Sequence, residues 1–146
     1  MVSIPAPTPR HQLINGRWQI PMDELRAEKR SEIASARWAE MSEPTTVDGF
    51  PALWFADKES MNDMHRASSD LQTAIAMELL PPETTVGWKT ADGSFTTLSL
   101  NDLITVRLLL SQRQQALYAK EAVILALIAA AETPADLDAI SWEMVV

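Results

Sequence analysis

The sequence predicts a helix-rich α+β fold in which short β-hairpins alternate with long helices. Three turn signals, Asn15-Gly16, Asp48-Gly49 and Asp92-Gly93, each lie between short runs of residues that favour strands. A stretch in which apolar residues recur three or four positions apart follows each of these runs. The two periodicities therefore predict three successive pairs of a hairpin and a helix.

Residues 1–21 form the first predicted part, a Pro-rich arm followed by a hairpin that contains tryptophan. Alternating prolines, among them Pro5 and Pro7, favour an extended arm without internal hydrogen bonds. Asn15-Gly16 tolerates the positive φ angles of a two-residue turn, so the residues on either side are expected to pair as strands.

Residues 22–44 form the second predicted part, a single helix. Asp23 is a suitable start, because an acidic side chain complements the helix dipole in the first turn, and Pro44 ends the helix. Its apolar stripe is thin for its length. We therefore expect a projecting helix, or one that pairs with a neighbour through a narrow seam.

Residues 45–146 form the third predicted part, a compact domain of hairpins and helices. Thr133 and Pro134 are expected to cap and start a short helix near its end. The predicted elements are a hairpin over 45–55, a helix over 60–80, a hairpin over 85–98, a helix over 99–132, the short helix over 135–140 and a final strand over 141–146.

Apolar residues at helical spacing predict which side chains pack between the helices. The residues expected in this core are Leu71, Ile75, Leu117, Ile124 and Leu127. A second apolar stripe on the longest helix, which includes Leu108 and Tyr118, predicts contact with more than one helix. We expect an oligomeric, trimeric bundle, although the pattern leaves open whether the helices pack within one chain or between chains.

The composition excludes several classes of partner. The chain has 146 residues, a formal net charge of −8 and no cysteine. An acidic chain without a cluster of Lys and Arg repels phosphate groups, so neither nucleic acid nor an anionic membrane surface is expected. A chain without cysteine forms no disulfide, which suits synthesis in a reducing cytoplasm. The longest apolar run, Ala122–Ala131, is too short for a membrane span.

The sequence offers no pattern that supports catalysis or metal binding. His11 and His65 have no second histidine or carboxylate at the spacing of metal ligands. The nucleophile motif G-x-S-x-G and a Gly-rich phosphate loop are also missing from the sequence. We therefore expect no enzymatic activity, no cofactor and no metal.

The five tryptophans of the chain have three interpretations: buried core, an interface with another protein, or stacking against sugar rings. Burial in the core is the simplest of these. The hypothesis of a protein interface places the partner-binding surface on the arm, the first hairpin and two further tryptophans. Its residues are Pro5, Pro7, Leu13, Trp18, Ile20, Trp38 and Trp54.

Several segments, in order, resemble a domain found in small proteins of tailed bacteriophages that are often encoded near tail-fibre genes. These segments are Lys29–Arg37, Phe55–Ser60, Trp88–Gly93, Thr97–Leu103, Gln115–Tyr118, Ala129–Pro134 and Ala139-Ile140. The front segment, His11–Ile20, is similar to the short tryptophan-containing hairpin of tail-fibre assembly proteins. Gly93 departs from the asparagine that similar proteins often have, but both residues suit a turn.

The resemblance implies a non-enzymatic tail component: a structural or adaptor protein of the tail fibre or baseplate. Such a protein is made in the cytoplasm of the bacterial host, binds other phage tail proteins and resides in the virion. One alternative is a tail-fibre assembly chaperone that is absent from the mature particle. Another is a receptor- or glycan-binding module that uses the tryptophans of the strands.

Overall fold

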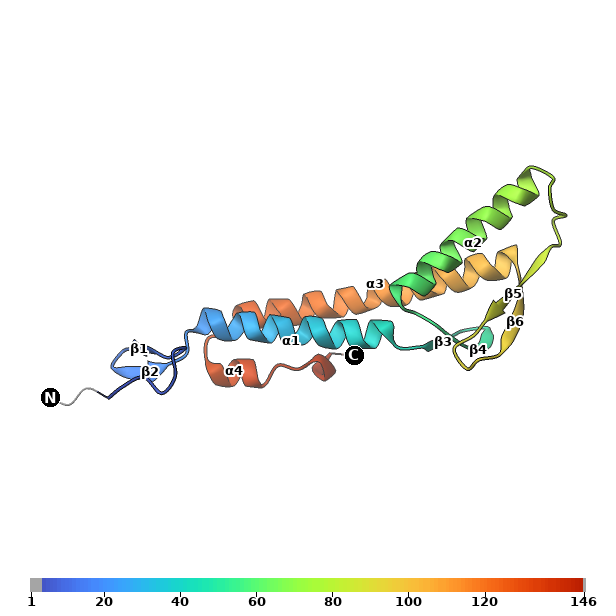
Figure 1. Ribbon diagram of the computed structural model, residues 1–146. Coiled ribbons are helices and arrows are strands. Elements are labelled where there is room, and N and C mark those ends of the chain that lie inside the picture. The colour runs from blue at the N-terminus through green and yellow to red at the C-terminus, as the bar shows by residue number, and fades with distance from the viewer. Residues whose placement is uncertain (1–3, 146) are drawn as a thin grey trace. The chain divides into compact units, whose positions relative to one another are not determined.

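The computed structural model describes residues 4–145 and confirms the α+β class (Figure 1). Along the chain lie β1 (Gln12–Ile14), β2 (Arg17–Gln19), α1 (Met22–Ser42), β3 (Thr45–Val47), β4 (Phe50–Trp54), α2 (Lys58–Ala76), β5 (Thr85–Lys89), β6 (Phe95–Ser99), α3 (Leu100–Ala130), α4 (Pro134–Asp138) and a 3₁₀ turn, Trp142–Met144. The predicted order of hairpins and helices is therefore confirmed.

The strands form three separate two-stranded antiparallel sheets, β1-β2, β3-β4 and β5-β6. Asn15 and Gly16 have φ angles of 49° and 78°, as a two-residue turn of this type requires. Gly49 and Gly93 also have positive φ angles, which an L-residue with a side chain adopts at a cost. The three sequence signals for turns thus mark all three hairpins.

The chain divides into two compact units. Unit 1 consists of Met1–Arg37 and Ala119–Val146, and unit 2 consists of Trp38–Tyr118. This division differs from the predicted parts 1–21, 22–44 and 45–146. The reason is that the last part of α3, from Ala119 on, belongs to the same unit as the N-terminal hairpin and most of α1, which are far from it in sequence.

Within unit 1, α1 is packed and does not project. Its Ile33 is fully buried, and Arg37 Nε donates to Glu121 Oε2 of α3 at 2.8 Å. Arg26 Nη2 donates to the carbonyl of Ala131, just after α3, at 2.7 Å. Because Arg26 meets residue 131 and Arg37 meets residue 121, α1 and this part of α3 run antiparallel.

Within unit 2, α3 supplies the corresponding contact to the end of α1. Arg113 Nη2 donates to the carbonyl of Glu40 at 2.6 Å, and Nη1 donates to that of Met41 at 3.3 Å. The last carbonyls of a helix have no partner within the helix. Neither α1 nor α3 has a basic residue in its own last turn, so each receives an arginine from the other helix.

An apolar cluster lies in unit 2, between the β3-β4 and β5-β6 hairpins and the helices α2 and α3. Its buried residues are Trp54, Ala56, Met64, Leu71, Leu98, Leu103, Val106 and Leu110, with Ile75 partly buried against them. The backbone N–H of Ala91 donates to the carbonyl of Leu53 at 2.7 Å and joins the two hairpins.

Within this chain, two residues differ in burial from what the sequence led us to expect. Trp54, expected to bind a partner, is 1% exposed and belongs to the core, because its strand packs against α2 and α3. Leu127, expected in the core, is 40% exposed, and Ile128 is buried in its place. Ile128 and Leu127 lie on either side of Ile124 around the helix, about 100° apart, so Leu127 sits at the edge of the face that Ile124 and Ile128 bury. Leu117 and Ile124 are buried.

The C-terminal segment contains one confirmed and one wrong prediction. Thr133 caps α4, and Asp136 completes a capping box, with Pro134 in the first turn. The strand expected over 141–146 is wrong for the described residues 141–145, which contain a 3₁₀ turn. Trp142 is buried there, with Lys120 Nζ 4.3 Å from its ring centre.

Candidate partner-binding surface

The N-terminal arm is held against the first hairpin. Trp18 Nε1 donates to the carbonyl of Ile4 at 2.7 Å, which brings the start of the described chain back onto β2. A hydrogen bond of 2.7 Å joins Thr8 Oγ1 and His11 Nδ1 and closes the turn between the arm and β1. Pro5 and Pro7 between these two contacts are exposed.

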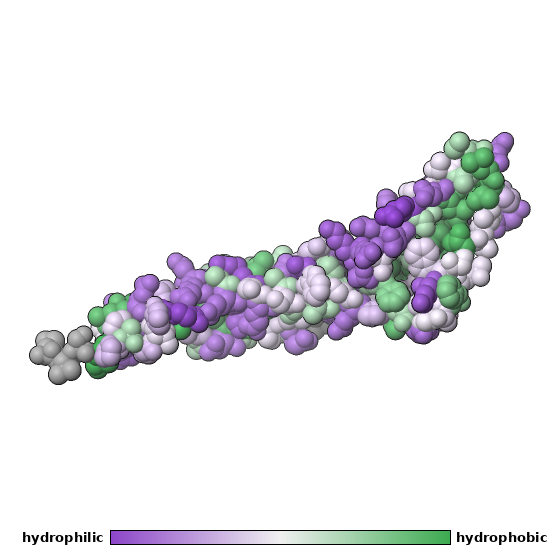
Figure 2. Space-filling model, in the orientation of Figure 1, coloured by the Kyte–Doolittle hydropathy of each residue, from purple (hydrophilic) through white to green (hydrophobic). Residues whose placement is uncertain are grey.

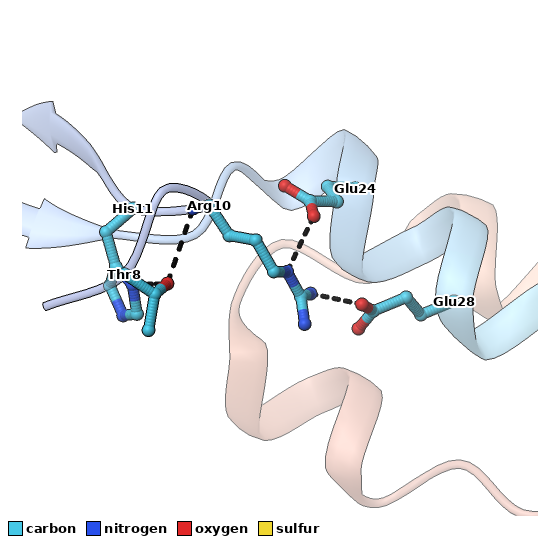
Figure 3. Close-up of polar contacts among 5 residues, drawn as sticks. All are labelled: Thr8, Arg10, His11, Glu24 and Glu28. Atoms are coloured by element: carbon cyan, nitrogen blue, oxygen red, sulfur yellow. Dashed lines mark hydrogen bonds and ion pairs between the residues drawn. The ribbon is translucent and has the colours of Figure 1, made fainter.

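Arg10 joins the arm to α1 (Figure 3). Its Nε donates to Glu24 Oε1 at 2.7 Å, and its Nη2 contacts Glu28 Oε1 one helical turn further along. All three side chains are 40% to 51% exposed, so each ion pair contributes only about 0–1 kcal/mol. The two ion pairs mainly orient the N-terminal arm, because a planar guanidinium that contacts two carboxylates through two of its nitrogen atoms has a fixed direction.

The fixed arm and hairpin present apolar side chains to solvent. Leu13 is 62% exposed and lies opposite Trp18 in the hairpin register, and Ile4 is 73% exposed. Trp18 and Ile20 are half-buried. Five of the seven predicted partner-binding residues, Pro5, Pro7, Leu13, Trp18 and Ile20, therefore lie together on this segment. We call this segment, residues 4–20, the arm–hairpin surface.

The other two predicted partner-binding residues do not join this surface. Trp54 is in the core, as described above, and Trp38 lies in unit 2, where its side chain is 66% exposed on α1. Arg10 was not predicted as a functional residue from the sequence. Its contacts with Glu24 and Glu28 of α1 form only because the β1-β2 hairpin between them folds back. Ile4 was not predicted either.

A depression of about 570 Å³ lies beside the arm–hairpin surface in unit 1. The hairpin, the first turns of α1 and α4 all contribute to its wall. Its lining residues are His11, Gln19, Ile20, Leu25, Glu28, Lys29, Pro134, Leu137 and Asp138. The lining combines the apolar residues Ile20, Leu25 and Leu137 with the charged residues Glu28, Lys29 and Asp138.

A second cleft, of about 400 Å³, lies in unit 2 and is aromatic. Phe55 and Phe95, which are 42% and 73% exposed, flank the half-buried Trp88, with Asp63 and Lys89 also in the lining. Of these three aromatic residues, only Trp88 belongs to the tryptophans that the sequence suggested for a binding role. Phe55 directly follows β4, and Phe95 is the first residue of β6. The two residues are far apart in the sequence, so their order along the chain does not predict that they share a cleft.

The carboxylates whose pKa is lowered have local structural roles. The Ser60 side chain and backbone hold the pKa of Asp57, the N-cap of α2, below its usual value. The backbone N–H of Glu132 and the Thr133 hydroxyl do the same for the pKa of Asp136. The Ser94 and Thr90 hydroxyls lower the pKa of Asp92 to about 2 in the β5-β6 turn.

Neither a metal site nor a bilayer-spanning helix emerges from the described part of the chain. Residues 4–145 contain no group of three or more His, Cys, Asp or Glu side chains arranged to hold a metal ion. No helix within the same residues combines the length and apolar character that crossing a membrane requires. The Nδ1 atom of His65 contacts the guanidinium of Arg107.

Among the comparisons with known proteins, only the comparison with protein families gives a match. No curated protein and no solved structure matches the chain. A family model, described as a domain of unknown function (DUF4376), matches residues 24–141. These residues begin in the first turn of α1 and end just before the last 3₁₀ turn, so they include most of both units but not the arm–hairpin surface. The chain therefore belongs to the DUF4376 family.

Proposed function

We propose that this protein is a non-enzymatic component of the tail of a tailed bacteriophage, which joins a tail fibre or the baseplate to a neighbouring tail protein. The ordered resemblance between residues 25 and 146 and small phage tail proteins supports the phage origin. The observation that carries the adaptor role is the arm–hairpin surface, whose apolar side chains are exposed while Arg10 and Trp18 hold its backbone in place.

An orientated surface binds a partner with a smaller loss of entropy than a free tail. Leu13 and Ile4 offer apolar contact area, and the half-buried Trp18 is of the residue type that most often dominates binding energy at interfaces. The family match begins at residue 24, after this surface. We expect the partner-binding segment to vary within the family while the body of the domain is kept.

Mass spectrometry of purified virions and of infected-cell lysate tests the location. Presence in the particle at the copy number of a fibre or a ring supports a structural tail component. Presence only in the lysate, bound to fibre protein, contradicts it and supports an assembly chaperone. Absence of the gene from any phage or prophage would contradict both.

Substitution of Leu13 tests the role of the arm–hairpin surface. Leu13→Asp places a charge at the exposed centre of β1 and should abolish incorporation into particles without changing the melting temperature. Gln12→Asp is the matched control, because Gln12 is the exposed neighbour on the same strand. Normal incorporation of Leu13→Asp would show that the tether lies elsewhere.

The aromatic cleft of unit 2 favours a second candidate, a glycan-binding module. Exposed aromatic rings beside Asp63 and Lys89 suit stacking against a sugar ring together with hydrogen bonds to its hydroxyls. Binding to a glycan array should be lost in Phe95→Ala and kept in Leu79→Ala, a change at another exposed apolar residue of unit 2. A wild-type protein that binds no glycan contradicts this candidate.

A further inference from the structure

A groove of about 560 Å³ lies in unit 2, between the start of α2 and the middle of α3 (Figure 1). The polar side chains in its lining are Lys58, Asn62 and His65 of α2 and Arg107, Ser111 and Gln114 of α3. On each helix these residues are four and then three positions apart, so they share one face of that helix. The two helices therefore turn polar faces towards a common groove.

The groove contains positive charge although the chain as a whole is acidic. The chain has 20 Asp and Glu residues against 12 Lys and Arg residues. Lys58 and Arg107 line the groove, whereas none of the acidic residues in the described chain does. On α2, Glu59 and Asp63 lie more than about 100° around the helix from the centre of the groove face. Asp63 pairs there with Arg66 at 3.6 Å, so the cations of the groove are not neutralised by it.

The guanidinium of Arg107 has a donor without an acceptor. Its Nη1 contacts Nδ1 of His65, and its Nε is buried and has no hydrogen-bond partner within residues 4–145. Arg37 and Arg113, which are also half-buried, donate to protein oxygen atoms. Arg26 has a buried Nε of the same kind, but its two other nitrogens both donate to oxygen atoms. A buried charged donor without an acceptor costs free energy, and a bound anion that supplies the acceptor removes that cost.

His65 contributes a further donor from the opposite helix. An arginine side chain can only donate, so Nδ1 of His65 accepts in its contact with Arg107. The neutral ring then carries its proton on Nε2, an N–H that lies outside this contact. Because His65 is exposed and Lys58 is exposed one helix face along, both reach a ligand from solvent without rearrangement of the core.

The groove is long enough for a peptide. From Arg107 to Tyr118, its α3 side covers about 16 Å of helix, which is the length of about five residues of extended chain. Asn62, Ser111 and Gln114 offer hydrogen bonds to a peptide backbone. Figure 2 shows a mostly hydrophilic surface over the first part of α2, with hydrophobic side chains gathered towards its C-terminal end. A small inorganic anion would use only the charged part of this groove.

We propose that this groove binds a short acidic segment of another protein, with Lys58, His65 and Arg107 as donors to a carboxylate. At physiological ionic strength, exposed charges more than about 8 Å apart are largely screened, so a single carboxylate in the groove interacts mainly with these residues. Nucleic acid or an anionic membrane extends over the rest of the chain, whose net charge of −8 repels it. The inference does not depend on the proposed role in a phage tail.

Titration of the full chain into a short fluorescent peptide of glycine and glutamate tests the proposal. The peptide should bind, and the same peptide with glutamine in place of glutamate should not. Arg107→Gln should weaken binding at least about tenfold, because it removes charge-assisted hydrogen bonds to the carboxylate. Arg66→Gln, at an exposed arginine of α2 outside the groove, is the matched control and should bind as the wild type does.

Lys58→Gln should also weaken binding, and this exposed residue tests the groove even if Arg107→Gln does not fold. Inorganic phosphate should displace the peptide only in large excess. The proposal is overturned if the wild type binds neither peptide, if it binds both equally, or if both groove variants bind as tightly as the wild type. Displacement of the peptide by an equal concentration of phosphate also overturns it, because the groove would then be a site for a small inorganic anion.

Discussion

The core of unit 2 draws on strands and helices, whereas that of unit 1 lies along α1, α3 and the C-terminal segment with Leu137 and Trp142. In unit 2, Trp54 from β4, Met64 from α2 and Leu103 from α3 are each at most 2% exposed and belong to one apolar cluster. In unit 1, Ile33 of α1 and Ile124 of α3 are fully buried. The residue directly before each of them in the sequence is exposed.

The rim of the helix pair in unit 1 consists of long basic side chains that reach over the apolar seam. Arg26 donates to the carbonyl of Ala131, Lys29 Nζ donates to that of Ile140 at 3.2 Å, and Arg37 pairs with Glu121. Each of these stems covers apolar surface while its head satisfies an acceptor. Arg26 and Lys29 thus complete backbone hydrogen bonding beside the seam, and we expect these bonds to stabilise unit 1.

Removal of the largest core side chain should have the largest effect. Trp54→Ala is expected to lower the free energy of unfolding by about 3–5 kcal/mol, because it leaves a cavity at the centre of the unit 2 cluster. Urea denaturation monitored by circular dichroism measures this loss. A loss below about 1 kcal/mol would mean that the cluster can collapse around the cavity.

Arg26→Met tests whether the polar rim stabilises unit 1. The change keeps most of the apolar stem and removes the donor to Ala131, so we expect a loss of about 1.5–3 kcal/mol. Hydrogen exchange should also become faster in the last turn of α3. Arg30→Met, at an exposed position of α1, is the matched control. Equal stability of the two variants would show that the rim contributes no more than a solvated surface.

The local features of this fold could be predicted from the sequence. Asn15-Gly16 specifies its hairpin, and Thr133-Pro134 specifies the start of α4, because turns and caps depend on a few adjacent residues. Five of the seven residues that the sequence proposed for partner binding lie on the arm–hairpin surface for a similar reason. They are close in sequence, and the chain needs only one tight turn to bring them together.

The features that depend on distant contacts could not be predicted. The thin stripe of α1 left open whether the helix projects or pairs through a narrow seam, since nothing in the local sequence shows that Arg26 and Arg37 meet residues 131 and 121. Leu127 has the spacing of a packing residue, but periodicity does not say whether the partner is the same chain or another copy.

Backbone strain at the end of α2 offers a smaller test, this time in unit 2. Glu78 has a φ angle of +58°, and its N–H donates to the carbonyl of Ile75 while that of Leu79 donates to Ala74. This is the Schellman arrangement, in which the left-handed residue is usually glycine. Glu78→Gly should therefore raise the free energy of unfolding by about 0.4–1 kcal/mol. A destabilised variant in urea denaturation would show that the Glu78 side chain makes a contact of greater value than the relieved strain.

The smallest effect is expected in the β5-β6 turn and appears only in acid. Asp92 Oδ1 accepts hydrogen bonds from the Ser94 hydroxyl at 2.6 Å, from the Thr90 hydroxyl at 2.5 Å and from the Ser94 N–H at 3.0 Å. These donors favour the ionised form, and they lower the pKa of Asp92 from 3.8 to about 2. The unfolded chain thus binds this proton more readily than the folded chain.

The sign of the pH dependence follows from that difference. The contribution of ionised Asp92 to stability is fully present above pH 3.8 and is lost as the pH falls towards 2. Asp57 and Asp136 also have lowered pKa values and add to the same slope, so the wild type must be compared with Asp92→Asn. Between pH 3.8 and about 2, the unfolding free energy of the wild type should fall more steeply than that of the variant. Parallel curves would mean that the turn keeps Asp92 no more ionised than the unfolded chain does, and the hydrogen bonds of Thr90 and Ser94 would then stabilise the turn without favouring the charge.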